Sequence, residues 1–200
     1  MSHAPAPPRR PEEGYPGAAA GGMRPRSAYH AAVQGFIVHP TYRLENGRPV
    51  VHLFGRLADG RSFLLRDRGF VPYFFVRTAD GETARAHGAA RQSPTSLKTM
   101  RGEPVVRVEV DAPDRMPPLR DALVKAGLPV FEADVRFAIR YLIDRGIRGA
   151  VEIDSGGGGA PASGPAATAR GVDAVFDDVP VRPSDLRPEA ERLRLVSIDL

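Results

Sequence analysis

Cysteine is absent from this 200-residue chain. Its absence excludes disulfides, thiolate zinc sites, iron–sulfur clusters and cysteine nucleophiles. The chain has no stretch near the roughly 18 consecutive apolar residues that a membrane helix needs. Its N-terminus lacks the apolar core of a signal peptide. These absences favour a cytoplasmic protein that makes no contact with a membrane.

Lysine is scarce: only Lys98 and Lys125 accompany the arginines among the 28 basic residues. An arginine skew of this kind is typical of a GC-rich genome. The distribution of charge is more informative, because residues 1–34 carry a net +2, residues 35–150 a net +6 and residues 151–200 a net −4. A basic middle region beside an acidic end fits a nucleic-acid-binding surface. A solvated globular surface would have a similar balance.

Glycine and proline are plentiful, with 21 and 20 residues. They gather in residues 1–33 and in the stretch 155–171 (SGGGGAPASGPAATARG), neither of which has apolar periodicity. We expect a disordered tail and a flexible insert, because neither segment can bury enough apolar surface to offset its chain entropy. The four glycines are not followed by Lys-Ser or Lys-Thr, so they do not form a phosphate-binding loop.

Alternating apolar residues predict a meander of antiparallel strands over 35–77. Residues 49–57 alternate between Glu45-Asn46-Gly47 and Asp59-Gly60, and we expect the latter to form a type I′ hairpin turn. Further strands are predicted at 104–110, 128–132 and 172–176. We expect an α+β fold built on one antiparallel sheet.

Two helices are predicted between these strands, and a weaker one at 80–91. The first runs from an Asp114 cap to Ala126, and the second from an Asp134 cap to about Arg145. In the second helix the pattern places a buried stripe along one face, comprising Val135, Ile139, Leu142 and Ile143.

No complete catalytic grouping is evident in the residues. His52 alternates within a strand and is expected at the surface or half buried. Asp177 and Asp178 are interpreted as surface charge, since neighbours in a strand point to opposite faces. Asp199 differs, because it lies within the apolar run 193–200, where a carboxylate is costly to bury unless it is paired or bound to a metal. The same run predicts that the chain is the front piece of a longer protein.

Four stretches carry a resemblance to a known family. They are 41–50 (TYRLENGRPV), 66–75 (RDRGFVPYFF), 131–146 (FEADVRFAIRYLIDRG) and 195–200 (LVSIDL). In order and spacing they resemble the N-terminal region of family B DNA polymerases of the archaeal type, also present in some bacteria. The resemblance covers about 35–154 and 172–200, and the 131–146 stretch is its most specific part.

The resemblance implies a domain organisation. Residues 34–154 would form the polymerase N-terminal domain, with an RNA-recognition-like (ferredoxin-like) core. Residues 172–200 would begin a ribonuclease H-like 3′–5′ exonuclease domain, in which Asp199 would be the first metal-binding carboxylate. The full enzyme would use Mg²⁺ and deoxynucleotides on a primer-template, beside the nucleoid and with a sliding clamp as a further partner. This segment alone would be inactive, because two-metal hydrolysis needs several carboxylates.

Archaeal members of the family also carry a template pocket that captures uracil. Matched by motif, its lining would be Tyr42, Pro72, Pro113, Met116, Phe137 and Arg140. Met116 departs from the family, where a small valine is usual, and its longer side chain could fill the space of a base. Phe137 and Pro72 could equally be core residues, and Arg140 an ion-pair partner of Asp144.

The resemblance implies that this segment guides single-stranded template DNA through arginine–phosphate contacts and aromatic surfaces. A free-standing RNA-recognition-like module that binds single-stranded nucleic acid is the alternative.

Overall fold

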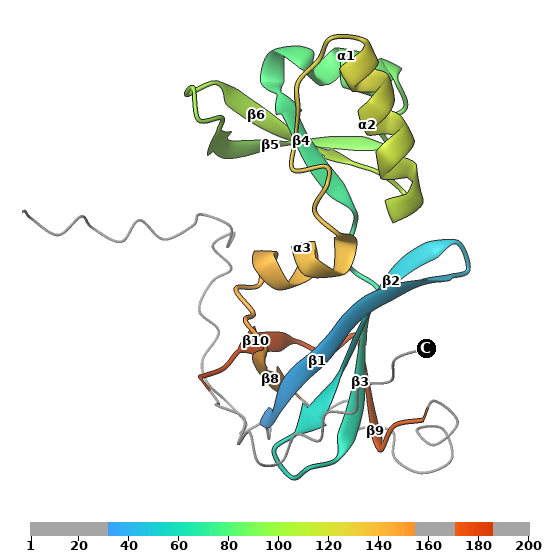
Figure 1. Ribbon diagram of the computed structural model, residues 1–200, viewed down its shortest axis with the longest axis vertical. Coiled ribbons are helices and arrows are strands. Elements are labelled where there is room, and N and C mark those ends of the chain that lie inside the picture. Colours follow the sequence, from blue (N-terminus) through green and yellow to red (C-terminus); the bar gives the residue numbers. More distant parts are fainter. Residues whose placement is uncertain (1–31, 155–170, 186–200) are drawn as a thin grey trace, which may run out of the picture.

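The computed structural model describes residues 32–154 and 171–185. They form a mixed α+β fold, mostly sheet, in which two separate sheets lie one above the other with a short helix, α3, between them (Figure 1). The expectation of an α+β fold is confirmed, but the expectation of one sheet is wrong. The meander of residues 32–67 and the strand at 73 belong to different sheets.

The lower sheet in Figure 1 has six strands in the order β10-β8-β1-β2-β3-β9. Four come from β1 (Ala32–Glu45), β2 (Arg48–Leu57), β3 (Ser62–Asp67) and β8 (Ala150–Asp154). Two short strands complete it, β9 (Ala174–Asp177) and β10 (Val181–Pro183). All neighbours are antiparallel except β3 and β9, which run parallel.

The two hairpin turns of the lower sheet differ from each other in type. Asn46 and Gly47 both have positive φ, at 52° and 77°, as a type I′ turn requires. In the second hairpin only Gly60 has positive φ, so a type I′ turn at Asp59-Gly60 is wrong. The amide of Gly60 donates to the carbonyl of Leu57, and the glycine completes a longer loop.

The six-stranded sheet is rolled until its two edges nearly meet. β9 ends at Asp177 and β10 begins at Val181, so these edge strands are at most about 14 Å apart along the chain. The amide of Asp178 donates to Arg66 of β3 at 2.8 Å, and the carbonyl of Pro180 accepts from Asp154 of β8 at 2.9 Å. We call this sheet the barrel. Residues 174–183, which the sequence assigned to a following domain, thus complete the barrel.

The interior of the barrel is filled by large side chains that alternate along each strand, including Val51, Leu53, Phe63, Leu65 and Ile153. The ring of Phe63 lies against the backbone of Gly55 on the neighbouring strand. A Cβ at Gly55 would lie 2.2 Å from the carbonyl oxygen of Phe36 and 2.5 Å from the Phe63 ring. This glycine therefore allows the close approach of strands and ring.

The upper sheet has four antiparallel strands in the order β5-β6-β4-β7. They are β4 (Tyr73–Arg77), β5 (Arg91–Lys98), β6 (Pro104–Glu109) and β7 (Val130–Phe131). Between them lie α1 (Gly81–Ala86), α2 (Met116–Lys125) and the 3-10 turns η1 (Thr78–Asp80) and η2 (Pro113–Arg115). Both helices cover one face of this sheet, where they form a second core around Phe74, Val108, Leu119 and Leu123.

The other face of the four-stranded sheet packs against α3 (Phe137–Asp144). The buried residues of α3 are Phe137, Ala138, Arg140 and Tyr141. The predicted stripe is therefore wrong, because Ile139 and Ile143 are exposed. The predicted caps are also wrong: neither η2 nor α3 has a side-chain cap hydrogen bond, and their capping residues are Ala112 and Arg136.

Candidate nucleic-acid interface

A groove lies where the middle of β1 meets the start of α2 and the entry to α3. We call it the β1–α3 groove. Its volume is about 500 Å³, within the range of small-ligand sites. Fifteen residues line it: His39, Pro40, Thr41, Tyr42, Pro113, Met116, Pro117, Arg120, Ala133, Asp134, Val135, Arg136, Phe137, Ala138 and Ile139.

Four of the six residues matched to a template pocket line this groove: Tyr42, Pro113, Met116 and Phe137. They come from three separate elements, β1, the η2–α2 entry and α3, so the tertiary fold brings them together. Pro72 and Arg140 are not among the lining residues. Both are buried elsewhere, Pro72 just before β4 and Arg140 on the inner face of α3.

The aromatic wall of the groove is a pair of rings. Tyr42 and Phe137 meet edge to face with their centroids 5.5 Å apart, a favoured geometry for two aromatic rings. Phe137 belongs to the barrel core, whereas Tyr42 remains 37% exposed. The buried ring therefore holds the exposed ring in place, and Tyr42 offers a surface for another flat group.

Met116 also lines the groove, at the start of α2. It is only 6% exposed, because most of its side chain packs into the second core with Val110 and Leu119. Pro113 and Pro117 flank it along the same turn. This wall is therefore apolar and is anchored in the core of the four-stranded sheet.

The side chain of Arg140 is buried and contacts other residues of the chain instead of solvent. Its guanidinium pairs with Glu132 at 2.6 Å and lies 5.0 Å from the centre of the Tyr73 ring. The Tyr73 hydroxyl in turn donates to Asp144 at 2.7 Å, and burial together with this hydrogen bond raises the pKa of Tyr73 above its usual value. The proposed ion pair between Arg140 and Asp144 is therefore wrong, because Arg140 pairs with Glu132 and Asp144 accepts a hydrogen bond from Tyr73.

The charged groups that reach the groove are Arg120, Arg136 and Asp134. Arg136 is exposed, and Arg120 forms an exposed ion pair with Asp121 at 2.8 Å. An ion pair at the surface is weak and is readily exchanged for another anion. Sequence reasoning missed both arginines, although Arg136 lies in the most specific matched stretch.

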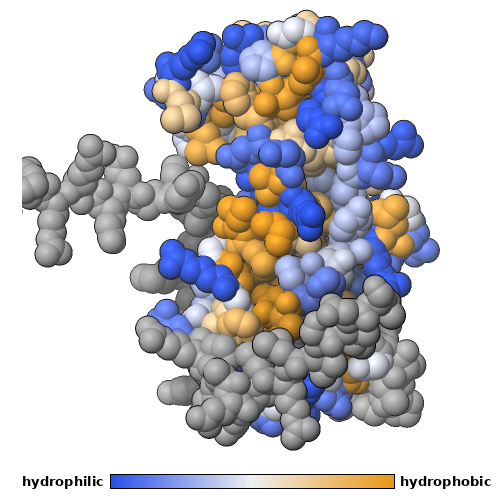
Figure 2. All heavy atoms as spheres, in the orientation of Figure 1, coloured by the Kyte–Doolittle hydropathy of each residue, from blue (hydrophilic) through white to orange (hydrophobic). Residues whose placement is uncertain are grey.

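Beside the groove, apolar side chains gather over α3 in the middle of the face shown in Figure 2. Ile139 and Ile143 are 40% and 57% exposed, and Leu142 is half buried. α3 is therefore apolar on both its inner and its outer sides.

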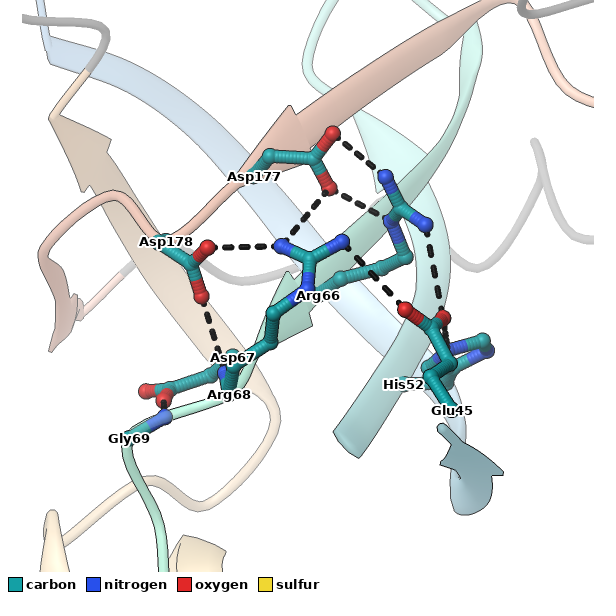
Figure 3. Close-up of polar contacts among 8 residues, drawn as sticks. All are labelled: Glu45, His52, Arg66, Asp67, Arg68, Gly69, Asp177 and Asp178. Carbon is teal, nitrogen blue, oxygen red and sulfur yellow. Dashed lines mark hydrogen bonds and ion pairs between the residues drawn. The ribbon is translucent and has the colours of Figure 1, made fainter. Parts of the chain in front are cut away.

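A second group of functional-type residues lies on the barrel, away from the groove (Figure 3). Arg66 pairs with both oxygens of Asp177 at 2.5 Å and with Glu45 at 3.3 Å. Arg68 pairs with Asp178 at 2.6 Å. Both aspartates are exposed, as interpreted from the sequence, and each is paired with an arginine. The φ of Asp178 is 51°, which breaks strand alternation.

His52 belongs to the same group and is buried, whereas the sequence pattern predicted a surface or half-buried position. Its Nε2 lies 3.2 Å from Glu45, while its Nδ1 has no partner among the described residues. Burial lowers the pKa of His52 below 6.5, although the hydrogen bond to Glu45 opposes this. Burial raises the pKa of Glu45, but the contacts with His52 and Arg66 outweigh it and leave the pKa below 4.5.

These residues do not form a metal site. Within the ranges 32–154 and 171–185, no three acidic or histidine side chains are grouped to hold an ion. Asp199, proposed as a metal ligand, lies outside the described residues. None of the described helices is long and apolar enough to span a bilayer.

Comparison with known proteins bears on the sequence resemblance. No protein-family model matches the chain. The chain is 34% identical over 123 residues to the DNA polymerase of Archaeoglobus fulgidus and 30% identical over 126 residues to that of Thermococcus sp. (strain 9oN-7). Each match covers 56% of this chain and 16% of the relative. These matches show homology to archaeal family B DNA polymerases.

The fold is shared as well. The structure of the family B DNA polymerase from Pyrobaculum calidifontis matches 78% of this chain with a TM-score of 0.58, at 24% identity. The match spans only 21% of that polymerase. The homology is with the N-terminal region of such polymerases, and the chain spans about a sixth or less of the curated relatives it matches.

Proposed function

We propose that this chain is part of a DNA-directed DNA polymerase and that its β1–α3 groove guides single-stranded template DNA without catalysing a reaction. The observation that carries the proposal is the exposed ring of Tyr42, held edge-on by Phe137 beside Arg120 and Arg136. An aromatic platform for bases with cations at its rim is the usual means of binding a single strand without sequence preference.

We assign the four-stranded sheet to the ferredoxin-like class. Its elements follow the order β4-α1-β5-β6-α2-β7, and its strands lie in the order β5-β6-β4-β7. This β-α-β-β-α-β arrangement is the one that defines that class. RNA-recognition modules of the class stack bases on aromatic residues of the helix-free face.

That face has a different role in this chain, which argues against the alternative of a free-standing RNA-binding module. Tyr73 and Phe75 lie on the helix-free face and are 6% and 7% exposed. They pack with Phe137 and Tyr141 of α3 in one core. Bases cannot reach these rings while α3 is in place, so the groove at the edge of α3 is the better candidate.

The further elements of the proposal concern residues outside the described ranges. Asp199 would be the first carboxylate of a 3′–5′ exonuclease with a ribonuclease H-like fold that needs Mg²⁺ and further carboxylates. The described residues do not supply such a donor set. We expect the purified 200-residue chain neither to shorten a primer nor to extend it.

The test is a fluorescence anisotropy titration of the chain with labelled single-stranded oligonucleotides that differ only in uracil or thymine. We expect weak binding that falls with rising salt, because arginine–phosphate contacts release counterions. Tyr42→Ala should weaken it by about 1–3 kcal/mol, the loss of one stacked base. Arg136→Ala should reduce the slope of log binding affinity against log salt concentration by about one, because one phosphate contact is lost. Arg101→Ala, in the β5–β6 turn, is the matched control.

Uracil should bind about as tightly as thymine, because Met116 occupies the apolar wall that a deoxyuridine base would contact. A tenfold preference for uracil, about 1.4 kcal/mol, would contradict this part of the proposal. Binding that is unchanged in both Tyr42→Ala and Arg136→Ala would contradict the groove itself.

A further inference from the structure

The η2–α2 turn lines a second cavity besides the β1–α3 groove. We call it the hairpin cavity, because the tip of the β1–β2 hairpin lines it together with the loop after α1 and the start of α2. Its volume is about 650 Å³, within the range of small-ligand sites. Its apolar lining includes Leu44 and Leu119, and its polar lining includes His87, Asp111, Asp114 and Arg115. It shares no lining residue with the groove, so the role of the groove does not account for it.

The groove and the hairpin cavity lie side by side between β1 and the start of α2. Tyr42 lines the groove, and Leu44, two residues further along β1, lines the cavity. Residues two apart on a strand point to the same side and lie about 6.8 Å apart. Both side chains are exposed, at 37% and 50%. On the other side, Met116 lines the groove and Arg115 lines the cavity. A nucleic-acid strand that passes Tyr42 along β1 therefore reaches the hairpin cavity next.

The polar side chains of the cavity have no partner within the part of the chain that the structure describes. The side chains of His87, Asp111, Asp114 and Arg115 form neither a hydrogen bond nor an ion pair there, and all four residues are exposed. Asp178, an exposed aspartate on the barrel, is by contrast paired with an arginine. The histidine and the two aspartates are not grouped closely enough to hold a metal ion. The cavity therefore offers free hydrogen-bonding groups to an organic ligand.

The two carboxylates select among the parts of a nucleic-acid strand. An ionised carboxylate accepts hydrogen bonds and cannot donate them, and it repels a phosphate. Guanine carries two adjacent N–H donors on its Watson–Crick edge, which match the two oxygens of one carboxylate. Cytosine and adenine each carry one amino group on that edge. Thymine places its single N–H donor between two carbonyl oxygens, which a carboxylate repels. The cavity therefore suits a base with an amino group better than it suits a phosphate or a thymine.

We propose that the hairpin cavity binds the base that follows the one on Tyr42, and that it prefers a base with an amino group, guanine most strongly. The proposal rests on the proposed function of the groove and adds a sequence preference that an aromatic platform alone does not supply. Asp111 and Asp114 accept hydrogen bonds from the base, and the exposed side chain of Leu44 contacts its face. Arg115 is the donor available to a carbonyl oxygen of the base.

The test compares two short single strands by fluorescence anisotropy, one of thymine only and one with a single central guanine. We expect the guanine strand to bind about fivefold tighter or more, the lower end of what a bidentate contact to a base discriminates. The double variant Asp111→Asn with Asp114→Asn should bring the ratio of the two affinities to within twofold. Glu82→Gln, an exposed carboxylate on α1 outside the cavity, is the control and should keep the parent ratio. A uniform change of charge alters both affinities alike, so the ratio reports the cavity.

The outcomes separate the cavity from the groove. A ratio near one in the parent chain, with thymine binding still weakened by Tyr42→Ala, would overturn the cavity and leave the groove in place. A guanine preference that survives the double variant would also overturn the assignment to Asp111 and Asp114. A guanine preference lost in the double variant, with thymine binding unchanged by Tyr42→Ala, would support the cavity and contradict the groove. Binding of a labelled arginine-rich peptide that the double variant abolishes, without any guanine preference, would assign the cavity to a cationic protein segment instead.

A second measurement locates the base directly, and the absence of cysteine makes an introduced thiol unique. Ala122→Cys places a thiol in the lining of the cavity. Val124→Cys, exposed on the same helix but outside the lining, is the matched control. A strand whose guanine amino group carries a short tethered disulfide should link to Ala122→Cys at a yield several-fold above the control. Equal yields, or no link at either position, would overturn the placement of the base.

Discussion

The barrel and the four-stranded sheet protect their edges in different ways. The barrel joins its two edge strands through residues 178–180 and pairs Arg66 with Asp177 across the β3–β9 boundary. The four-stranded sheet leaves β5 at an open edge, where Pro94 and a largely polar sequence discourage pairing with other chains. At its edges the barrel therefore depends on closure and on this ion pair, whereas the upper sheet depends on Pro94 and the largely polar sequence of β5.

α3 connects the two regions. Tyr141 donates to Asp67 of the barrel at 2.8 Å, while Tyr73 of the upper sheet donates to Asp144 of α3 at 2.7 Å. The core that fills the barrel also contains Tyr73 and Phe75 from the upper sheet. We therefore expect the two regions to unfold together.

The largest expected effect tests this coupling. Phe63→Ala in the barrel and Phe74→Ala in the upper sheet each remove a fully buried ring and should cost about 3–5 kcal/mol of unfolding free energy. Urea denaturation followed by circular dichroism and tyrosine fluorescence should show one transition that moves to lower urea in both variants. Met100→Ala, at a fully exposed position, is the control. Two separate transitions, with only one moved by each variant, would show that the regions are independent.

Packing inside the barrel gives the next effect. Gly55→Ala places a Cβ 2.2 Å from the carbonyl oxygen of Phe36, so two strands must separate, at a cost of about 1–3 kcal/mol or more. At Gly69 the nearest atom to an added Cβ is 3.4 Å away, an ordinary contact. Gly69→Ala should therefore be close to neutral in the same denaturation experiment. Equal losses in both variants would argue against close packing of Phe63 on Gly55.

Sequence patterns predicted the elements whose residues alternate or repeat regularly. The strands at 49–57 and 104–110 were predicted because apolar and polar residues alternate with a period of two. The strand at 62–65 was predicted as the return strand after the turn signal Asp59-Gly60. β5 and β10 were missed because they are polar, contain proline and lie at edges, where burial imposes no pattern. The division into two sheets depends on long-range pairing, which local periodicity does not report.

α3 and the groove show a second limit. Because α3 is apolar on both sides, periodicity could not choose between the stripe at Ile139 and the face at Phe137 and Tyr141. The choice is made by distant partners, the Asp67 carboxylate and the Tyr73 hydroxyl. Four of the residues matched by the family resemblance line one groove, but the resemblance could not show that Arg140 pairs with Glu132 and does not line it.

Closure of the barrel by ion pairs is tested by a second pair of variants. Asp177→Asn removes the charged partner of Arg66, whose side chain is 11% exposed, and should cost about 1.5–3 kcal/mol. Asp178→Asn is the matched control, because Arg68 is 39% exposed and an exposed pair contributes about 1 kcal/mol or less. Asparagine also tolerates the positive φ of residue 178. Similar losses in the two variants would show that burial of Arg66 does not matter for closure.

The smallest expected effect is a pH dependence confined to the barrel. The pKa of His52 is lowered from 6.5 in the folded chain, so the unfolded chain binds a proton more readily. The resulting stability is present above pH 6.5 and is lost as the pH falls through the lowered pKa. Glu45, whose pKa is lowered from 4.5, adds a further loss of stability below that pH.

The variant His52→Gln tests this dependence, because its side-chain amide can donate to Glu45 but does not titrate. Between pH 5 and 6.5, its urea midpoint should change less with pH than the midpoint of the parent chain. His87→Gln, at an exposed position beyond α1 in the other region, should retain the parent slope. An unchanged slope in His52→Gln would show that the acid sensitivity of the barrel arises from other groups.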